Sequence, residues 1–382
     1  MKKNLKKKLK KIKKKIKMDK RTIKWGVIFI IFCLLFVGVL KFVEIYDNFE
    51  KFKNYPSFDK QFNDYHKTLE IIQKTKTDSI LNPHYIYYDL TPEIENEGLK
   101  IVGYGPVQLP EEIQIRVMVV CGQHGREYVS SELCFALIRL LQLQARDDNY
   151  TTRLSLLQIG NVGIWVVPVA NPWARTFVEL NETNTCRRTN ANSIDLNRNF
   201  PHAKIFEWQT FEQSPYSDDG IHPEDNPGTS PLSEYETVAM VEYINYVDPH
   251  MIINIHSGSN DILLPYDYVV DVQPKHYRIM VKLANYARKS SCPECKLGTA
   301  STLLYTAKGT LIDYALLYTN TQLAYTLEIF SSSSIVNDHQ LTPEECKNYF
   351  NPQYGDELLH VLRKWIHFIL SLIEKLLKEI KQ

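Results

Sequence analysis

Four short apolar runs recur along the chain, each of a length that suits one buried strand. They are IQIRVMVV (113–120), VGIWVVPVA (162–170), MIINIHS (251–257) and LAYTLEIF (323–330). Between them, apolar residues repeat with helical spacing at 129–141, 233–247 and 274–290. Strands that are apolar throughout and alternate with helices predict an α/β fold, in which a mixed, twisted central sheet carries helices on both faces.

A longer apolar stretch stands near the N-terminus. WGVIFIIFCLLFVGVLKFV (25–43) is interrupted only by Lys41, and about 20 apolar residues span a bilayer as a helix. The lysine-rich residues 1–24 before it favour the cytoplasmic side. We therefore expect a single-pass signal anchor, with residues 44–382 in the lumen or outside the cell. A cleaved signal peptide, which would give a secreted protein, is the alternative.

The remainder of the chain predicts one large domain. Residues 44–79 are expected to form a juxtamembrane stalk with a leading helix, and residues 80–382 a single folded domain. A hydrophobic content of 44% supports a sizeable core. The amphipathic pattern of residues 357–382 predicts a terminal helix that docks on the sheet rather than a second membrane span.

The charge is divided unevenly along the chain. The net charge is only +1, but residues 1–24 hold 14 Lys and Arg against one Asp. The other residues, with 31 basic and 43 acidic side chains, therefore have a balance of −12. Because the domain is acidic, nothing in it indicates binding to nucleic acid. We expect the basic tail to orient the anchor at the membrane.

Six of the seven cysteines follow the anchor, where an exported domain can keep disulfides. They are Cys121, Cys134, Cys186, Cys292, Cys295 and Cys346. Cys292 and Cys295 form an isolated CxxC motif, which favours a loop disulfide over a zinc half-site or a redox pair. The pairing of the six does not follow from the sequence. Possible glycosylation sites at Asn149-Tyr-Thr and Asn181-Glu-Thr agree with export.

Chargeable side chains stand at the ends of two of the apolar runs. His124 and Glu127 follow the run 113–120, and His256 lies near the end of the run 251–257. Taken singly, each is more simply understood as a polar strand end. In open α/β sheets, however, ligands gather at the carboxyl ends of strands. Two histidines and one glutamate form a known catalytic zinc arrangement, so the set predicts one Zn²⁺ per chain.

Two further features suit hydrolysis at such a metal. Glu328 lies in the otherwise uncharged run 323–330, where a buried carboxylate is either paired with a core arginine or placed to accept a proton from water. The segment CRRTNANSIDLNRNF (186–200) carries three arginines. Arginine side chains bind carboxylates through two hydrogen bonds, so this segment suits an anionic end of a substrate. A solvated basic turn is the alternative.

Five segments together resemble a known family. HGRE, CRRTN…DLNRNF, NIHSGSN…LPYDY, LLYTAKGTLIDY and YTLEIF occur in the order and at the intervals of the zinc metallocarboxypeptidases related to pancreatic carboxypeptidases A and B. The resemblance covers roughly residues 80–375. It implies an exopeptidase that hydrolyses the C-terminal peptide bond of peptides or proteins and releases single residues. We expect it to act as a monomer on free C-termini.

The resemblance also implies which residues carry out the reaction. His124, Glu127 and His256 match the zinc ligands of the family, and Glu328 matches its general base. Arg187 matches the arginine that stabilises the tetrahedral oxyanion. These roles agree with the chemistry inferred from the residues themselves.

Further matches imply how a substrate is held. Asn197 and Arg198 match the groups that bind the free C-terminal carboxylate, and Tyr305 matches a tyrosine that closes over the bound substrate. Arg126 matches a secondary arginine in the substrate channel. A clamp on the terminal carboxylate would restrict attack to the last peptide bond.

Two matched positions indicate different preferences for the C-terminal residue of the substrate. Ile312, in GTLIDY, matches the floor of the side-chain pocket, and an aliphatic floor resembles the enzymes that prefer hydrophobic ends. Asp267, in LPYDY, matches a wall position where basic-specific relatives have aspartate. A desolvated aspartate would favour terminal Lys or Arg, and the interpretation leans slightly to basic ends. An exposed loop position is the alternative for Asp267.

Two other functions remain open. One is an amidase of the same fold that acts on a cell-wall-type peptide, although Asn197, Arg198 and Tyr305 fit an ordinary α-carboxylate. The other is a catalytically inactive, membrane-anchored binding domain. The presence of every zinc-ligand match and of Glu328 disfavours the inactive form.

Overall fold

The computed structural model describes most of the chain beyond the predicted stalk. The described residues are 85–89, 101–141, 150–204 without 151–152, 155–156, 158–159, 182 and 184, then 223–332, 341–353 and 355–380. The predicted basic tail, anchor and stalk lie outside them. Within these ranges, no helix has both the length and the apolar character needed to cross a membrane.

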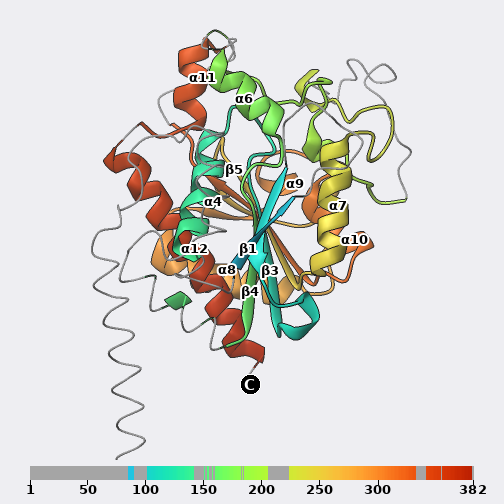
Figure 1. The fold of residues 1–382 in the computed structure, drawn as a ribbon, viewed down its shortest axis with the longest axis vertical. Coiled ribbons are helices and arrows are strands. Elements are labelled where there is room, and N and C mark those ends of the chain that lie inside the picture. Colours follow the sequence, from blue (N-terminus) through green and yellow to red (C-terminus); the bar gives the residue numbers. More distant parts are fainter. Residues whose placement is uncertain are drawn as a thin grey trace, which may run out of the picture. The chain divides into compact units, whose positions relative to one another are not determined.

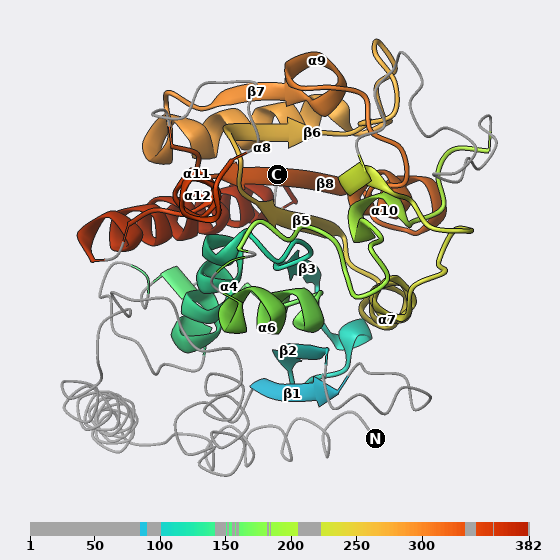
Figure 2. The same cartoon turned by 90° about the horizontal axis from the view of Figure 1, so that it is seen from above.

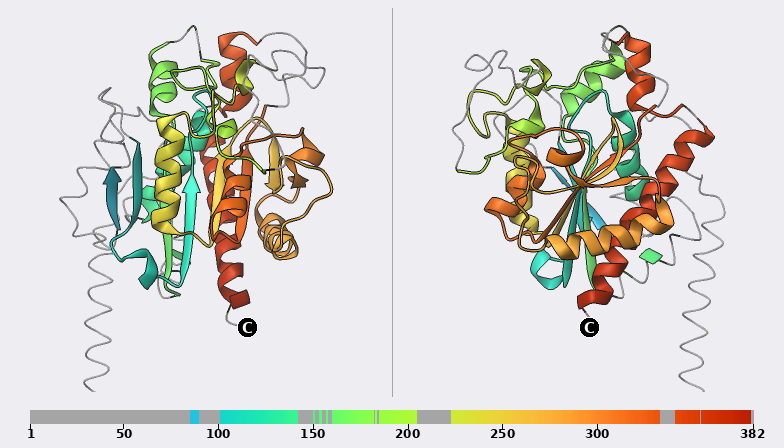
Figure 3. Two further views of the ribbon diagram at one scale, coloured as in Figure 1. Left: turned by 90° about the vertical axis from the view of Figure 1, so that its right-hand side faces the viewer. Right: turned by 180° about the vertical axis from the view of Figure 1, so that it is seen from behind.

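Eight strands of the described residues form one sheet (Figure 1). In spatial order they are β1 (Tyr85–Asp89), β2 (Val102–Pro106), β4 (Val162–Val167), β3 (Ile115–Val120), β5 (Met251–His256), β8 (Leu323–Ile329), β6 (Asn260–Leu264) and β7 (Lys296–Thr299). The four central strands β4, β3, β5 and β8 are parallel, whereas β2 and β6 run antiparallel to the central strands beside them. The sheet is mixed, as the sequence predicts, and Figure 3 shows its strands fanning out as it twists.

Helices cover both faces of this sheet (Figure 2). One face carries α4 (Tyr128–Leu141), α8 (Tyr277–Ser291) and α12 (Asp356–Ile380). The other face carries α7 (Tyr235–Val247) and α10 (Leu311–Tyr318). The remaining short helices are α6 (Pro172–Leu180), α9 (Ala300–Leu303), α11 (Pro343–Phe350) and the 3-10 turns η1 (Pro110–Glu112), η2 (Leu196–Arg198) and η3 (Pro223–Asp225). The predicted α/β class is confirmed.

Alternate residues of the central strands face the two helical layers. In β3, Val117 and Val119 pack with the cluster under α4 and α12, whereas Met118 and Val120 pack with the cluster under α7 and α10. Because both faces of the strand are covered, its sequence is apolar at every one of these positions. This double burial explains the uninterrupted apolar runs of the sequence.

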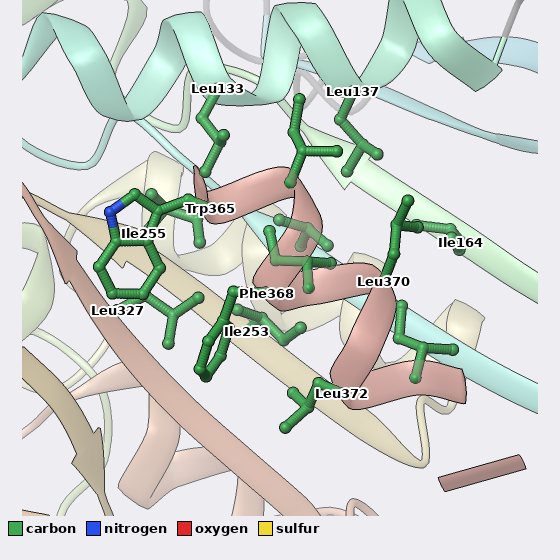
Figure 4. Packing of buried hydrophobic residues seen from close by; sticks show 14 of the residues in the cluster. Leu133, Leu137, Ile164, Ile253, Ile255, Leu327, Trp365, Phe368, Leu370 and Leu372 are labelled. Carbon is green, nitrogen blue, oxygen red and sulfur yellow. The ribbon is translucent and has the colours of Figure 1, made fainter. Parts of the chain in front are cut away.

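The C-terminal helix α12 is docked along one face of the sheet. Figure 4 shows Trp365 and Phe368 of α12 close to residues of β5 and β8 such as Ile255 and Leu327. Trp365 is fully buried, and its indole N–H donates to the carbonyl oxygen of Ile329 at 2.7 Å. Complete burial of such a side chain stabilises the fold by about 2–3 kcal/mol. The amphipathic pattern of this segment therefore identified the helix and the way it docks.

Three disulfides pair the six cysteines that follow the predicted anchor. They join Cys121 to Cys134, Cys186 to Cys346, and Cys292 to Cys295. The CxxC motif therefore forms a local disulfide, as its isolation in the sequence favours. The bond between Cys186 and Cys346 connects the arginine-rich segment to α11 across a sequence separation of 160 residues.

The strand register brings the predicted functional residues to one edge of the sheet. In the parallel pairs, Val120 lies opposite Asn254, and His256 lies opposite Glu328. The carboxyl ends of β3, β5 and β8 are therefore level with one another. The loop that follows β3 and leads into α4 carries His124 and Glu127 to the same edge.

Candidate metal centre and substrate cavity

His124, Glu127 and His256 converge at this edge, each nearly inaccessible to solvent. The Nδ1 atom of His124 lies 2.7 Å from Glu127 Oε1, and the Nδ1 atom of His256 lies 3.0 Å from Glu127 Oε2. The two Nδ1 atoms are 3.1 Å apart. One candidate ligand atom from each residue lies within 4.8 Å of the others, so a single ion could contact all three.

The outward nitrogen of each imidazole also has a partner. His124 Nε2 lies 3.0 Å from Asp195 Oδ1, and His256 Nε2 lies 3.1 Å from Gln123 Oε1. A proton held on Nε2 by these acceptors leaves both Nδ1 lone pairs directed at the same point. Two oriented imidazoles and one carboxylate are a donor set that fits Zn²⁺. Neither Asp195 nor Gln123 was predicted from the sequence, although a metal-binding histidine needs such a partner.

Asp195 is fully buried among cations. Its Oδ2 atom accepts hydrogen bonds from Arg188 Nε at 2.9 Å and Nη2 at 2.7 Å, and Arg198 Nη1 lies 3.8 Å away. Burial opposes ionisation, but the two guanidinium groups and His124 outweigh it and hold the pKa of Asp195 well below its usual range. Asp195 is therefore a fixed carboxylate that orients His124 and both arginines.

The structure places Arg188, not Arg187, at the centre of the site. Arg188 Nη1 lies 3.2 Å from His124 Nδ1 and 3.8 Å from Glu127 Oε1. The Arg187 side chain instead donates to the carbonyl oxygens of Thr189 and Asn190 and lies over the ring of Trp173. The expected position of Arg187 is therefore corrected by one residue. Neighbouring side chains of a non-helical segment point to different sides, and the resemblance alone did not separate two adjacent arginines.

Glu328 faces the same cavity from β8, beside His256. It is half-buried, and desolvation is the main reason why its pKa is raised to about 7. The charge of Glu127 adds to this shift, whereas His256 opposes it. A carboxyl group with a pKa near neutrality can both accept and return a proton at physiological pH.

A cavity opens over these groups, and most of the predicted substrate-binding residues line it. Its lining includes His124, Arg126, Glu127, Arg188, Asn197, Arg198, His256, Asp267, Tyr305 and Glu328. Arg198 Nη2 donates to the Tyr305 hydroxyl oxygen at 3.3 Å, and Asn197 Oδ1 accepts from the backbone N–H of Leu311 at 2.9 Å. Tyr305 is 55% exposed, which places it at the mouth. Arg126 donates to Glu224 at 2.7 Å.

Asp267 lines the cavity, whose wall also includes small and uncharged residues. Among these are Leu263, Ala300, Ala307, Thr310 and Thr326. Asp267 is 4% exposed, and its Oδ1 atom has no hydrogen-bond partner among the described residues. Burial raises the pKa of Asp267 to about 6. The exposed-loop alternative for this residue is therefore excluded.

Ile312 does not line this cavity. Its side chain is fully buried within α10, and Thr310, the residue just before that helix, lines the cavity instead. The expectation that Ile312 forms the floor of the side-chain pocket is corrected accordingly. The next residue, Asp313, accepts the backbone N–H of Asp267 with both carboxylate oxygens at 3.0 Å and so supports the Asp267 backbone from beneath.

Known proteins are similar to this chain in sequence and in fold. The model of the zinc carboxypeptidase family matches residues 99–351, a range that contains every candidate site residue described above. The chain belongs to the zinc carboxypeptidase family. Among curated members, rat mast cell carboxypeptidase A is 27% identical over 220 residues, which are 52% of this chain and 48% of that protein. A yeast member, named inactive metallocarboxypeptidase ECM14, is 26% identical over 201 residues, 50% of this chain and 43% of its own.

The match to these family members is partial. The chain spans about half the length of the curated relatives it matches. Solved structures extend the similarity of fold: bovine thrombin-activatable fibrinolysis inhibitor, in complex with tick carboxypeptidase inhibitor, superposes with a TM-score of 0.61 at 17% identity, covering 86% of this chain and 99% of that one. Carboxypeptidase A from Helicoverpa armigera gives 0.58 at 19% identity, covering 82% and 74%.

Proposed function

We propose that this chain is a zinc-dependent metallocarboxypeptidase that removes single residues from the free C-termini of peptides or proteins. The observation that carries the proposal is one shared cavity. It combines a donor set for Zn²⁺, a carboxyl group with a raised pKa, and an Asn–Arg pair suited to a carboxylate. Each of these groups alone also occurs at sites without catalysis, but their combination suits hydrolysis of a terminal peptide bond.

Asn197 and Arg198 would bind the terminal carboxylate of the substrate. The guanidinium of Arg198 is oriented by Asp195 and Tyr305, and the amide of Asn197 is held by its bond to Leu311. A carboxylate bound there would set the last peptide bond beside His124, Glu127 and His256. Such positioning limits the reaction to the end of a chain. Tyr305, at the mouth, is placed to cover the bound residue, and Arg126 to contact the preceding part of the peptide.

Glu328 would act as the general base and then as the general acid. Its carboxylate would accept a proton from the attacking water and return it to the departing amine. A zinc ion held by the two Nδ1 atoms and Glu127 supplies Lewis-acid polarisation of the carbonyl and acidifies water. We assign stabilisation of the developing oxyanion to Arg188, because its guanidinium lies beside the metal ligands while that of Arg187 does not.

We propose that the preferred terminal residue is Lys or Arg. The buried Oδ1 atom of Asp267 offers an acceptor without a partner among the described residues, at a site where a cation of a substrate could pair with it. The burial of Ile312 away from the cavity removes the main support for a preference for hydrophobic ends.

The location of the enzyme is also a proposal. The sequence of residues 25–43 supports a single-pass anchor with a cytoplasmic N-terminus, and the three disulfides agree with a catalytic domain in the lumen or outside the cell. A secreted form after signal cleavage is the second possibility. We propose a monomeric enzyme with no role for nucleic acid.

Two alternatives compete with this function. One curated relative is named inactive, so a binding domain without catalysis is the first of them. Against it stands the retention of His124, Glu127, His256 and Glu328 in a single cavity. The second is an amidase acting on a cell-wall-type peptide, against which the Asn197 and Arg198 pair favours an ordinary α-carboxylate.

The test is an assay of the full chain for release of the last residue from peptides ending in Arg, Lys, Phe, Leu or Glu. We expect release of Arg and Lys that a zinc chelator abolishes and that added Zn²⁺ restores. Glu328→Gln should lower kcat by about 10²–10⁴-fold while zinc binding is retained. A folded, zinc-loaded protein that releases nothing from any of these peptides would exclude the carboxypeptidase and leave the two alternatives.

A further inference from the structure

The two imidazoles of the candidate metal centre are held by partners of different charge. The Nε2 atom of His124 meets the carboxylate of Asp195, whose negative charge is balanced by Arg188 and Arg198. Among the described residues, the Nε2 atom of His256 meets two neutral amide groups, those of Gln123 and Asn254. Neither amide residue has a role in the function proposed above.

Gln123, Asn254 and His256 form a closed triangle of polar groups. Gln123 Oε1 lies 3.1 Å from His256 Nε2 and 2.8 Å from Asn254 Nδ2, and that Nδ2 atom lies 2.9 Å from His256 Nε2. Gln123 is 2% exposed and Asn254 is fully buried. These groups are shielded from water, where an unsatisfied buried polar group costs about 1–3 kcal/mol. They therefore depend on one another for their hydrogen bonds, although Asn254 Oδ1 has no partner among the described residues.

The triangle fixes where the His256 proton resides. Nδ1 of His256 faces Glu127 and His124, so metal binding requires the proton on Nε2. Gln123 Oε1 is then the acceptor, and it also accepts from Asn254. If the oxygen and nitrogen of both amides are exchanged, the Asn254 oxygen accepts from the same two neighbours instead. In either arrangement one amide oxygen accepts from the imidazole N–H, and the second amide orients the first by donating to the same oxygen. The nitrogen of that second amide also lies near Nε2, but this contact joins two donors and is not a hydrogen bond.

The positions of Gln123 and Asn254 in the chain link the loop that carries His124 to the strand that carries His256. Gln123 directly precedes His124 in the loop after β3, and its own carbonyl oxygen accepts from Asn171 at 3.1 Å. Asn254 stands two residues before His256, so both side chains project from the same face of β5. The contact between Gln123 and Asn254 therefore joins the backbone segments of both imidazole ligands.

We propose that Gln123, paired with Asn254, is a positioning residue that fixes the tautomer and ring orientation of His256 for zinc. The proposal rests on the zinc site of the proposed function but not on its catalytic activity. A neutral amide partner orients the imidazole of His256 as the carboxylate of Asp195 orients that of His124. The centre thus gains an oriented second imidazole without a further negative charge beside the metal.

The first test measures the zinc dissociation constant of the full chain in detergent by competition with a chelator. Gln123→Met keeps the length of the side chain but removes its hydrogen bonds, and we expect it to weaken zinc binding about 10–100-fold. Gln123→Glu keeps an acceptor and should remain within about threefold of the parent chain. Gln114→Met makes the same change at an exposed position just before β3 and serves as the matched control.

Two outcomes would overturn the proposal. One is a folded Gln123→Met variant whose zinc dissociation constant equals that of the Gln114→Met control. The other is a Gln123→Glu variant that binds zinc as weakly as Gln123→Met. Zinc binding at full affinity without hydrolysis would exclude only the proposed function, whereas a parent chain that binds no zinc would exclude the metal centre and this proposal with it.

A second measurement covers the case in which Gln123→Met does not fold. Proton–nitrogen spectra of histidine-labelled, zinc-loaded protein should show slowly exchanging Nε2–H signals for His124 and His256. In Gln123→Glu the His256 signal should move downfield, because its acceptor gains a charge, and the His124 signal should stay in place. A His256 signal that does not move would show that Gln123 is not its partner.

Discussion

Two buried carboxylates, Asp267 in the cavity wall and Asp195 behind the metal ligand His124, are in opposite electrostatic states. Asp195 is surrounded by Arg188, Arg198 and His124, and its pKa is held well below its usual range. Asp267 is almost as deeply buried, but burial raises its pKa to about 6, and its Oδ1 atom has no hydrogen-bond partner among the described residues. The charge of Asp195 is thus balanced by the protein's own cations, whereas Thr310, Arg198 and Ala300 offset the burial of Asp267 only in part.

The difference distinguishes a charge that the protein balances with its own side chains from a charge that a bound substrate could balance. At the metal end, the hydrogen bonds of Asp195 orient His124 and both arginines before any substrate arrives, as catalysis by preorganised charges requires. At Asp267 the protein keeps a buried acid without an equal compensation, which disfavours its ionisation. A terminal Lys or Arg would supply the missing positive charge.

The metal end gives the largest expected effect. Arg188→Met should lower kcat by about 10²–10³-fold, the usual loss for one donor to a developing oxyanion. Arg187→Met should change kcat by less than about threefold, because this side chain bonds to nearby carbonyl groups outside the cavity. Steady-state kinetics on an Arg-ending peptide would measure both.

Arg188 also neutralises Asp195, so its loss could act on the fold. Zinc content and thermal unfolding of both variants must therefore accompany the kinetics. Equal losses of kcat in the two variants, or a larger loss for Arg187→Met, would return the oxyanion role to the position that the sequence first suggested.

The second effect concerns Asp267. Asp267→Asn should lower kcat/KM for peptides ending in Arg or Lys by about 10–100-fold, the range for losing a hydrogen-bonded partner of a charged group. Peptides ending in Phe or Leu make no such contact and should be cleaved at nearly the parent rate. If both kinds of peptide lose equally, Asp267 supports the cavity wall and does not select the residue.

The sequence was sufficient for the fold class and for bringing together the three candidate metal ligands. Uninterrupted apolar runs identify parallel strands with both faces covered, and their carboxyl ends must meet at one edge, so His124 and His256 could be placed together. The sequence was insufficient to choose between neighbouring residues for a single role. Arg187 and Arg188 are adjacent and chemically identical, and only the backbone path determines which side chain faces the metal ligands.

Partners that are distant in sequence also escaped prediction. Asp195 meets His124 across 71 positions, and Gln123 meets His256 across 133. No periodic pattern marks such contacts, because they depend on how loops from separate strands pack over the sheet edge. Ile312 shows that a motif match does not determine the direction of a side chain. An apolar residue in a matching motif can point into the core as easily as into a cavity.

A smaller effect follows from the titration of Asp267. Its pKa of about 6 means that the carboxylate is mostly neutral at pH 5 and mostly charged at pH 7. The preference for Arg over Phe ends, expressed as a ratio of kcat/KM values, should therefore rise about tenfold over this interval. Taking the ratio removes the titration of Glu328, which affects both peptides alike. The ratio should stay flat in Asp267→Asn, and a flat ratio in the parent chain would mean that Asp267 does not contact the substrate.

The smallest effect is on stability, and it should have opposite signs at the two carboxylates. The pKa of Asp267 is raised in the folded state, so its contribution to stability is present below the unfolded pKa and is lost as pH rises through about 6. Asp267→Asn should therefore stabilise the protein by about 1–2 kcal/mol at pH 7 and have little effect near pH 4.

The pKa of Asp195 is depressed, so its contribution to stability is present at neutral pH, and Asp195→Asn should destabilise the fold there. Denaturant unfolding of both variants at the two pH values measures this contrast. If Asp267→Asn were instead destabilising at pH 7, the carboxylate would already have a compensating partner, and the cavity would not need a cation from the substrate.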